Sequence, residues 1–225
     1  MMDWRGSLEG LRQRMKAVYP GADSRTMERA IEKVARTSMQ ADETRLRNAV
    51  ATAQLLVDYR LSEATVLAEL ARPFAEAGAD AKALEGEFGK EVAGMAAELA
   101  AINKIAGEGN PEKTEKMLLT LARDFRLLLI MLAERKTRLE QSLQEGEADK
   151  ALAAEVLEIY APLAEKLGIN ELRNALEDLA FRALYAGEYQ RLAERLRQSE
   201  KTRERELQLA VGTLGKEVVK QGIKA

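Results

Sequence analysis

Apolar residues recur along the chain at intervals of three and four, which is the spacing of one face of an α-helix. Alternating apolar and polar runs bounded by turn residues, which would indicate strands, are missing. The pattern therefore predicts an all-α protein, a multi-helix bundle of about ten helices. In the first half of the chain the predicted helices cover residues 7–18, 24–34, 44–59, 62–74, 80–88 and 90–105.

The second half of the chain opens with two distinct helix starts. Asn110–Pro111–Glu112 combine an N-cap, a proline at the first helical position and an acid in the first turn. Asp124 is expected to open the next helix, whose residues 127–133 (LLLIMLA) are apolar on every side. Such a segment predicts a central buried helix of the bundle.

Three more helices are predicted toward the C-terminus. One covers residues 150–167 and ends at Gly168, and the next is capped by Asn170. Gly187 is expected to break that element, and a long charged helix follows over about 188–225. Its mixed charges at short spacing are typical of a solvated helix face. With no repeat and no evident linker, the whole chain, residues 1–225, is predicted to be a single domain.

Arg72 and Pro73 stand in the last turns of the fourth predicted helix, in the stretch AELARPFAEAGAD of residues 68–80. Because proline lacks an N–H, Pro73 forfeits a backbone hydrogen bond to the Glu69 carbonyl, at a cost of about 3 kcal/mol in an ordinary helix interior. The helix is therefore expected to kink or end there. The alternative is that it finishes near Arg72 and that Pro73 begins a loop toward Gly78.

Composition argues against two classes of partner. Lys+Arg 35 against Asp+Glu 37 leaves a net charge of −2, and only 4% of residues are aromatic, so the chain lacks both a basic field and a stacking surface for nucleic acid. The longest apolar run is far short of the roughly 20 residues that a bilayer requires, and the N-terminus lacks the apolar segment of a signal peptide. We therefore expect a cytoplasmic protein without nucleic acid or membrane as a direct partner.

The chain contains no cysteine and no histidine. Their absence removes disulfides, the usual zinc sites, a cysteine nucleophile and an imidazole base near neutral pH. What remains is chemistry by carboxylates, Lys, Arg, Tyr or Ser, with a hard cation bound through oxygen as an option. GEGN at 107–110 lacks the strand and the Lys-Ser/Thr pair of a phosphate loop, and a di-metal bundle on Glu177 and Asp178 would need a Glu-x-x-His pair.

Six segments occur in an order typical of one family: VYPGADSRTMERAIEKVA (18–35), LSEATVLAEL (61–70), EGEFGKEVAGM (85–95), EKMLLTLARDFRLLLIMLAERKTRL (115–139), EIYAPLAEKLGI (158–169) and LEDLAFRALYAGEYQRLAERL (176–196). They resemble the N-terminal hydrolase region of RelA/SpoT-type (p)ppGpp synthetase/hydrolases, over nearly the whole chain. The resemblance implies an all-α HD-type fold. In that family the region removes pyrophosphate from the 3′ position of (p)ppGpp with a bound Mn²⁺ ion.

The resemblance also places the family's functional residues on this sequence. The first metal-binding histidine falls in Asn48–Ala49–Val50, the His-Asp dyad on Arg72–Pro73, and the last ligand, an aspartate, on Glu134. The water-activating Glu-Asp pair falls on Glu76–Ala77, and a His-Asn pair near the nucleotide on Thr137–Arg138. Neither Arg72 nor Pro73 can donate electrons to a metal, so the resemblance implies that Mn²⁺ is lost and that no cofactor is bound.

Together these substitutions predict a degenerate, pseudo-hydrolase form of the HD domain. The chain is then expected not to be an enzyme but a regulatory or scaffolding domain of an alarmone synthetase, whose full-length parent would be a GTP pyrophosphokinase. Its expected partner is the synthetase domain, in cis or in trans, with residues 188–225 as the connection toward it. Guanine nucleotide remains a further candidate partner, although the family's nucleotide-recognition loop is rewritten as RTSMQADETRLRN over residues 36–48.

Two readings of Arg72 remain open. Its guanidinium could contact a phosphate of a bound nucleotide in a vestigial site that also includes Arg138. It could instead act as a structural cation that neutralises Glu134 and Glu76, and the cost of an unpaired charge in a closed cavity favours this reading. Other functions also remain open: a (p)ppGpp or GTP sensor that does not cleave, and a residual hydrolase with an oxygen-only metal site on Glu76 and Glu134.

Overall fold

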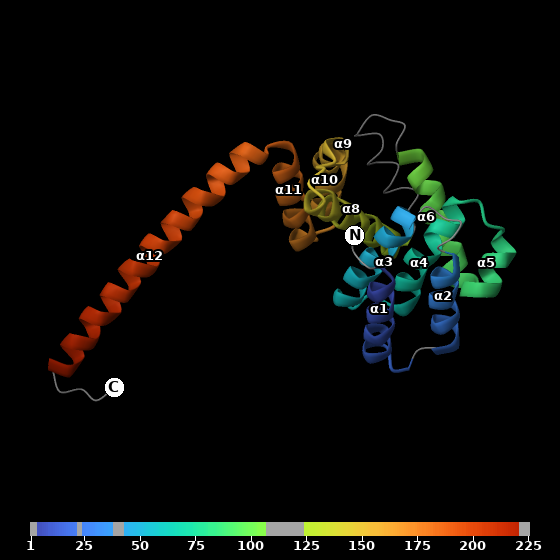
Figure 1. Ribbon diagram of the computed structural model, residues 1–225, viewed down its shortest axis with the longest axis horizontal. Helices are drawn as coiled ribbons and strands as arrows, with labels where there is room; N and C mark the ends of the chain where they lie inside the picture. Colours follow the sequence, from blue (N-terminus) through green and yellow to red (C-terminus); the bar gives the residue numbers. More distant parts are fainter. Residues whose placement is uncertain (1–3, 22–23, 38–42, 107–123, 221–225) are drawn as a thin grey trace. The chain divides into compact units, whose positions relative to one another are not determined.

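The computed structural model describes residues 4–21, 24–37, 43–106 and 124–220 (Figure 1). Every regular element in these ranges is a helix, so the prediction of an all-α fold is confirmed. The chain divides into two compact units, Met1–Ala183 and Leu184–Ala225. A single domain over residues 1–225 stays a prediction, and the boundary between the units lies close to residue 188, where the connecting segment was expected to begin.

The first six helices follow the predicted ranges closely. They are α1 (Trp4–Val18), α2 (Ser24–Thr37), α3 (Glu43–Asp58), α4 (Glu63–Glu76), α5 (Ala81–Phe88) and α6 (Lys90–Ala106). Side-chain caps explain two of the starts. The Ser62 hydroxyl accepts from the Thr65 N–H at 3.4 Å, and the Asp80 carboxylate accepts from the Ala83 N–H at 3.1 Å.

The remaining described elements are α8 (Phe125–Gln144), α9 (Lys150–Glu155), the π-helical η1 (Val156–Tyr160), α10 (Ala161–Lys166), α11 (Asn170–Leu184) and α12 (Ala186–Lys220). Asp124 caps α8 as predicted, since its side chain accepts from the Arg126 N–H at 2.9 Å. The helix predicted over 150–167 is instead interrupted by the π-helical turn. The start predicted at Asn110–Pro111–Glu112 lies outside the described residues.

Helix α4 lies at the centre of the first unit, where it packs against α2, α3, α5, α6 and α8. All its residues from Thr65 to Phe74 are buried. Ala68 and Ala71 are fully buried, and such small side chains let neighbouring helices approach closely. The prediction that residues 127–133 form a buried helix is also confirmed, with only Leu129 partly accessible. The core therefore surrounds α4 and the first half of α8.

Helix α4 does not end at Arg72, as one of the two alternatives required, but continues through Glu76 with Pro73 inside it. The amide groups that follow remain hydrogen-bonded: Ala77 N–H donates to the Pro73 carbonyl at 3.1 Å and Gly78 N–H to the Ala75 carbonyl at 3.0 Å. Burial on several sides therefore keeps the last turn helical although one backbone bond is lost.

The break predicted at Gly187 is also misplaced. Helix α11 ends at Leu184, and Gly187 lies in the first turn of α12. The Tyr189 N–H already donates to the Tyr185 carbonyl at 2.9 Å. Glycine costs only about 1 kcal/mol relative to alanine within a helix, which the long helix tolerates.

Within the described ranges, none of the helices combines the length and the apolar character needed to cross a membrane.

Candidate functional site

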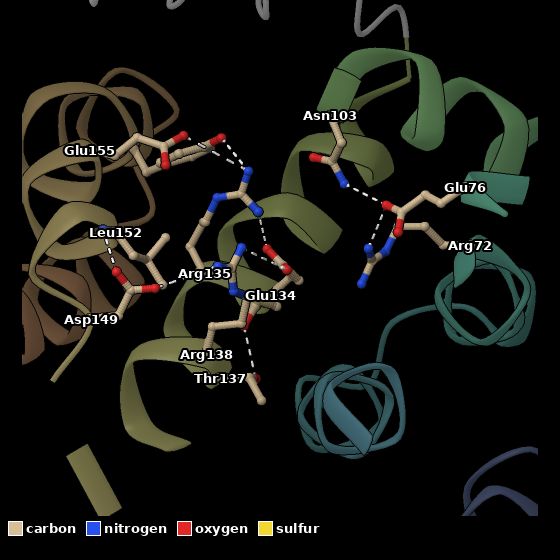
Figure 2. A network of polar contacts seen from close by, with 12 residues as sticks. Arg72, Glu76, Asn103, Glu134, Arg135, Thr137, Arg138, Asp149, Leu152 and Glu155 are labelled. Atoms are coloured by element: carbon tan, nitrogen blue, oxygen red, sulfur yellow. Dashed lines mark hydrogen bonds and ion pairs between the residues drawn. The ribbon is translucent and has the colours of Figure 1, made fainter. Parts of the chain in front are cut away.

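A pocket of about 790 Å³ lies in the first unit and is lined by residues of α3, α4, α6 and α8 and by Gly78. Its polar lining residues are Arg45, Asn48, Arg72, Glu76, Asn103, Lys104, Glu134, Arg135 and Arg138. Five of these side chains are cationic and two are anionic. Figure 2 shows Arg72 and Glu76 on one side of this region and Glu134, Arg135 and Arg138 on the other.

Arg72 is held by two carboxylates of its own helix. Its Nε and Nη2 donate to the two oxygens of Glu69 at 2.8 Å each, and its Nη1 donates to Oε1 of Glu76 at 2.7 Å. Glu69 is 0% exposed and Arg72 is 5% exposed. We call these three residues the buried clamp. It is a bidentate ion pair, shielded from water, with a third charge-assisted bond beside it.

The helical repeat explains why the buried clamp forms. Glu69 and Glu76 lie three residues before and four residues after Arg72, so all three side chains share one face of α4. The pair between Arg72 and Glu76 spans Pro73 and links the turns on either side of it. Asn103 Nδ2 of α6 donates to Glu76 Oε1 at 3.1 Å (Figure 2). The clamp therefore also ties the end of α4 to α6.

A second network lies on α8. Glu134 pairs with its neighbour Arg135 and, at 3.7 Å, with Arg138. The Arg135 Nη2 donates to the Tyr160 hydroxyl at 2.7 Å, and the guanidinium carbon lies 4.6 Å from the centre of the Tyr160 ring. Glu155 lies 4.0 Å from Arg135. Through Arg135 the pocket is thus connected to the π-helical turn that ends at Tyr160.

Burial and neighbouring charges shift the pKa of the two buried carboxylates, Glu69 and Glu134, in opposite directions. Burial raises the pKa of Glu69 to about 7, although Arg72 beside it favours the ionised form. Burial would also raise the pKa of Glu134, but the charges of Arg135 and Arg72 outweigh it and hold that pKa below its usual value. The pKa of Arg72 is raised because Glu69 outweighs the effect of burial. Near neutral pH, Glu134 is therefore ionised and Glu69 lies close to its titration point.

The structure brings most of the residues singled out from the sequence to this pocket. Asn48, Arg72, Glu76, Glu134 and Arg138 all line it, whereas Pro73 and Ala77 do not. Within the described ranges, Arg72 and Glu134 form no ion pair, contrary to expectation. Glu69 engages Arg72 with both oxygens from the same helix, and Glu134 has two arginines of α8 at hand.

Sequence reasoning missed Glu69, Arg135 and Tyr160. Glu69 could have been found, because it stands three residues before Arg72 on a predicted helix, where a side chain of opposite charge is within reach. The contact between Arg135 and Tyr160 joins residues 25 positions apart, and no local pattern indicates it.

The four positions that the resemblance assigns to a metal do not fit Mn²⁺. Arg72 has no electron pair to donate and is engaged by Glu69 and Glu76, and Pro73 carries no donor atom in its side chain. Asn48 and Glu134 remain as oxygen donors. In the described part of the chain, no group of three or more acidic side chains is arranged to hold a metal ion.

The sequence pattern of a known family, described as HD domain, matches residues 26–170, which is more than half of the chain. The chain belongs to the HD domain family. The matched region contains the described parts of α3, α4, α6 and α8, and therefore the whole lining of the pocket. The HD-type fold that the resemblance implied is thus confirmed.

Several curated relatives share this region. A GTP pyrophosphokinase of Escherichia coli (strain K12) is 41% identical over 115 residues, which are 51% of this chain and 16% of that protein. A guanosine-3′,5′-bis(diphosphate) 3′-pyrophosphohydrolase of Vibrio cholerae is 36% identical over 152 residues, 64% of this chain and 21% of its own length. The bifunctional (p)ppGpp synthase/hydrolase SpoT of Escherichia coli (strain K12) is 35% identical over 152 residues, which are 64% of this chain and 22% of that protein. The resemblance to RelA/SpoT-type proteins is confirmed, although the match spans only about a fifth of each relative.

These relatives correct one expectation. The chain was expected not to be an enzyme, but relatives at 35–36% identity are named as a 3′-pyrophosphohydrolase and a synthase/hydrolase, so the family is enzymatic. The expectation rested on the substitution of the family's metal ligands at Asn48, Arg72 and Pro73 and on the absence of histidine. That absence removes one kind of ligand and one kind of base, and it leaves carboxylate, amide and hydroxyl groups in place.

Proposed function

We propose that this chain is the HD region of a RelA/SpoT-type enzyme of (p)ppGpp metabolism and that it has a regulatory or scaffolding role there. One observation carries the proposal. Where the resemblance places a metal-binding dyad, Arg72 is engaged by Glu69 and Glu76 and is 5% exposed. A guanidinium in this position supplies from within the chain the positive charge that neighbouring carboxylates require.

The proposal includes independence from Mn²⁺. If Arg72 replaces a metal as the buried positive charge, then neither Mn²⁺ nor EDTA changes the melting temperature of the protein. An Arg72→Ala variant lowers the melting temperature, because Glu69 loses its partner while it remains buried. A rise in melting temperature on addition of Mn²⁺ to the unmodified chain would contradict this part of the proposal.

The regulatory role is tested with the chain added in trans. The chain is titrated into the isolated synthetase region of the Escherichia coli GTP pyrophosphokinase, and the formation of guanosine polyphosphate is followed. We expect the rate to change and then to saturate as chain is added. The Arg72→Ala variant tests whether the pocket is needed, and a surface variant, Arg14→Ala on α1, serves as the control. A rate that stays constant at every concentration of chain would sink the regulatory role.

A second candidate function is nucleotide sensing, and the composition of the pocket favours it. Five cationic side chains against two anionic ones, around about 790 Å³, suit a ligand that carries several phosphates. Calorimetry with (p)ppGpp in EDTA tests it, since the chelator prevents metal-dependent cleavage. Heat of binding would support a sensor, and its absence would leave the scaffolding role alone.

Hydrolysis is the third candidate, favoured by the names of the relatives. Here Glu76 and Glu134 would be the oxygen ligands of an added metal. Release of pyrophosphate from (p)ppGpp on addition of Mn²⁺, abolished by Glu134→Gln, would identify this activity.

A further inference from the structure

We propose that Glu69 sets the anion specificity of the pocket. By engaging Arg72 it keeps this guanidinium from phosphate and confines a diphosphate-bearing ligand to two more accessible cations, Lys104 and Arg138, which we call the outer cations. The inference does not depend on the regulatory role proposed above, and its test succeeds or fails independently of that role.

The first step concerns the donors of Arg72. A guanidinium has five N–H donors, and the edge formed by Nε and one Nη binds phosphate with two parallel bonds. In this protein that edge is filled by Glu69, whose two oxygens accept from Nε and Nη2 at 2.8 Å. Nη1 is engaged by Glu76 at 2.7 Å. Arg72 lines the pocket, but its Nε–Nη2 edge faces a carboxylate and three of its five N–H groups are engaged.

Replacing Glu69 by a phosphate as the partner of Arg72 would cost free energy. A phosphate that displaced Glu69 would leave this carboxylate without its partner at a site that is 0% exposed. Removing one partner of a buried ion pair is strongly destabilising, because the remaining charge is desolvated and uncompensated. The loss of this ion pair would reduce the free energy of binding of any ligand that contacts Arg72. Binding at Arg72 is therefore disfavoured for as long as Glu69 is ionised.

The third step concerns the outer cations. Lys104 is exposed, and 36% of the Arg138 side chain is accessible. The contacts of Arg138 with Glu134 and Asp149 are 3.7 and 3.6 Å long, beyond ordinary hydrogen-bond length. Such loose, partly solvated pairs cost little to exchange for a phosphate. The same pocket thus contains one arginine whose Nε–Nη2 edge is closed to anions and two cations open to them.

The test uses the whole chain and inorganic pyrophosphate as the probe. Glu69→Gln keeps the size of the side chain but presents one acceptor oxygen instead of two and carries no charge, so the Arg72 edge becomes available. Calorimetry is done at about pH 8, above the pKa of Glu69, where the unmodified carboxylate is ionised. We expect pyrophosphate to bind roughly tenfold more tightly to Glu69→Gln than to the unmodified chain.

Two controls show whether Arg72 is the cause. In a Glu69→Gln/Arg72→Gln double variant the gain should vanish, because the guanidinium that captures the anion is gone. Glu140→Gln removes one negative charge from a pair with Lys136 and should leave pyrophosphate affinity unchanged. Equal affinity of Glu69→Gln and the unmodified chain, or an equal gain in the double variant, overturns the proposal.

A measurement on the unmodified protein covers the case in which Glu69→Gln does not fold. The chain is treated with phenylglyoxal, which modifies accessible arginines, and the modified positions are mapped by mass spectrometry. Arg72 should stay unmodified with and without pyrophosphate, whereas Arg138 should be modified and should become protected by pyrophosphate. Modification of Arg72, or failure of saturating pyrophosphate to protect Arg138, overturns the proposal.

Discussion

At the scale of single residues, Glu69 and Arg72 each supply the other with an opposite charge in the core. Both are buried, and each would be costly alone. Glu134, a buried carboxylate that lines the pocket, has two arginines near it and a pKa below its usual value. Glu69 forms its ion pair with Arg72, and burial raises the pKa of Glu69 more than the charge of Arg72 lowers it. The pKa values of these two buried carboxylates are therefore shifted in opposite directions.

The raised pKa of Glu69 predicts how stability depends on pH. Its pKa changes from an ordinary 4.5 to about 7 in the folded protein, so between these values the folded state holds more protons than the unfolded state. The contribution of Glu69 to the free energy of unfolding is then fully present below about pH 4.5 and is lost as the pH rises through about 7. Urea unfolding between about pH 5 and 8 measures it. Glu69→Gln should remove this slope, and an unchanged slope in that variant would refute the assignment.

The partner of Arg72 marks the limit of prediction at this scale. The sequence places Arg72 on a helix with Glu69 and Glu76 within reach, and both contacts are local. Glu134 was preferred because the family resemblance sets it beside the same cavity. Which of the two carboxylates, Glu69 or Glu134, pairs with Arg72 depends on the distance between α4 and α8. The helical repeat within either helix gives no information about that distance.

At the scale of elements, the predicted helix starts were the most successful, because their signals are local. Ser62, Asp80 and Asp124 each cap the helix that follows them, through a bond to a backbone N–H two or three residues later. Pro73 is the opposite case. Its effect depends on whether the turn after it is held by other contacts, and those come from burial, from the pair between Arg72 and Glu76, and from Asn103 on another helix.

This account predicts that the last turn of α4 opens when Glu76 is removed. In Glu76→Ala the link across Pro73 and the contact with Asn103 are both lost. The amides of residues 77–79, which now bond to carbonyls of α4, should exchange with deuterium about tenfold faster. Glu140→Ala removes a pair at the same spacing in α8, a helix without proline, and is the matched control. Equal protection of residues 77–79 in both variants would show that the ion pair is not what holds this turn.

At the scale of the whole molecule, the pocket and the core belong to the first unit. Among residues whose side chains the structure describes, every buried hydrophobic side chain lies at or before Ala183, and the HD match ends at residue 170. Helix α11 completes this core with Leu172, Leu176 and Ala180, which are at most 3% exposed. The order of six sequence segments indicates the family, and the spacing of the apolar residues indicates the helical class. The sequence pattern places the start of the connecting segment near residue 188, and the boundary at residue 183 depends on packing that the pattern does not contain.

The last prediction follows from this division. A chain of residues 1–183 should fold by itself and melt within a few degrees of the full chain, because it keeps every described buried hydrophobic side chain. Its circular dichroism is followed through thermal unfolding, with residues 1–169 as the matched control. The shorter chain lacks α11 and should melt much lower, because it leaves the surface that Leu172, Leu176 and Ala180 cover open to water. If residues 1–183 unfold as readily as 1–169, the second unit contributes to the stability of the first and the division at residue 183 does not describe how the protein folds.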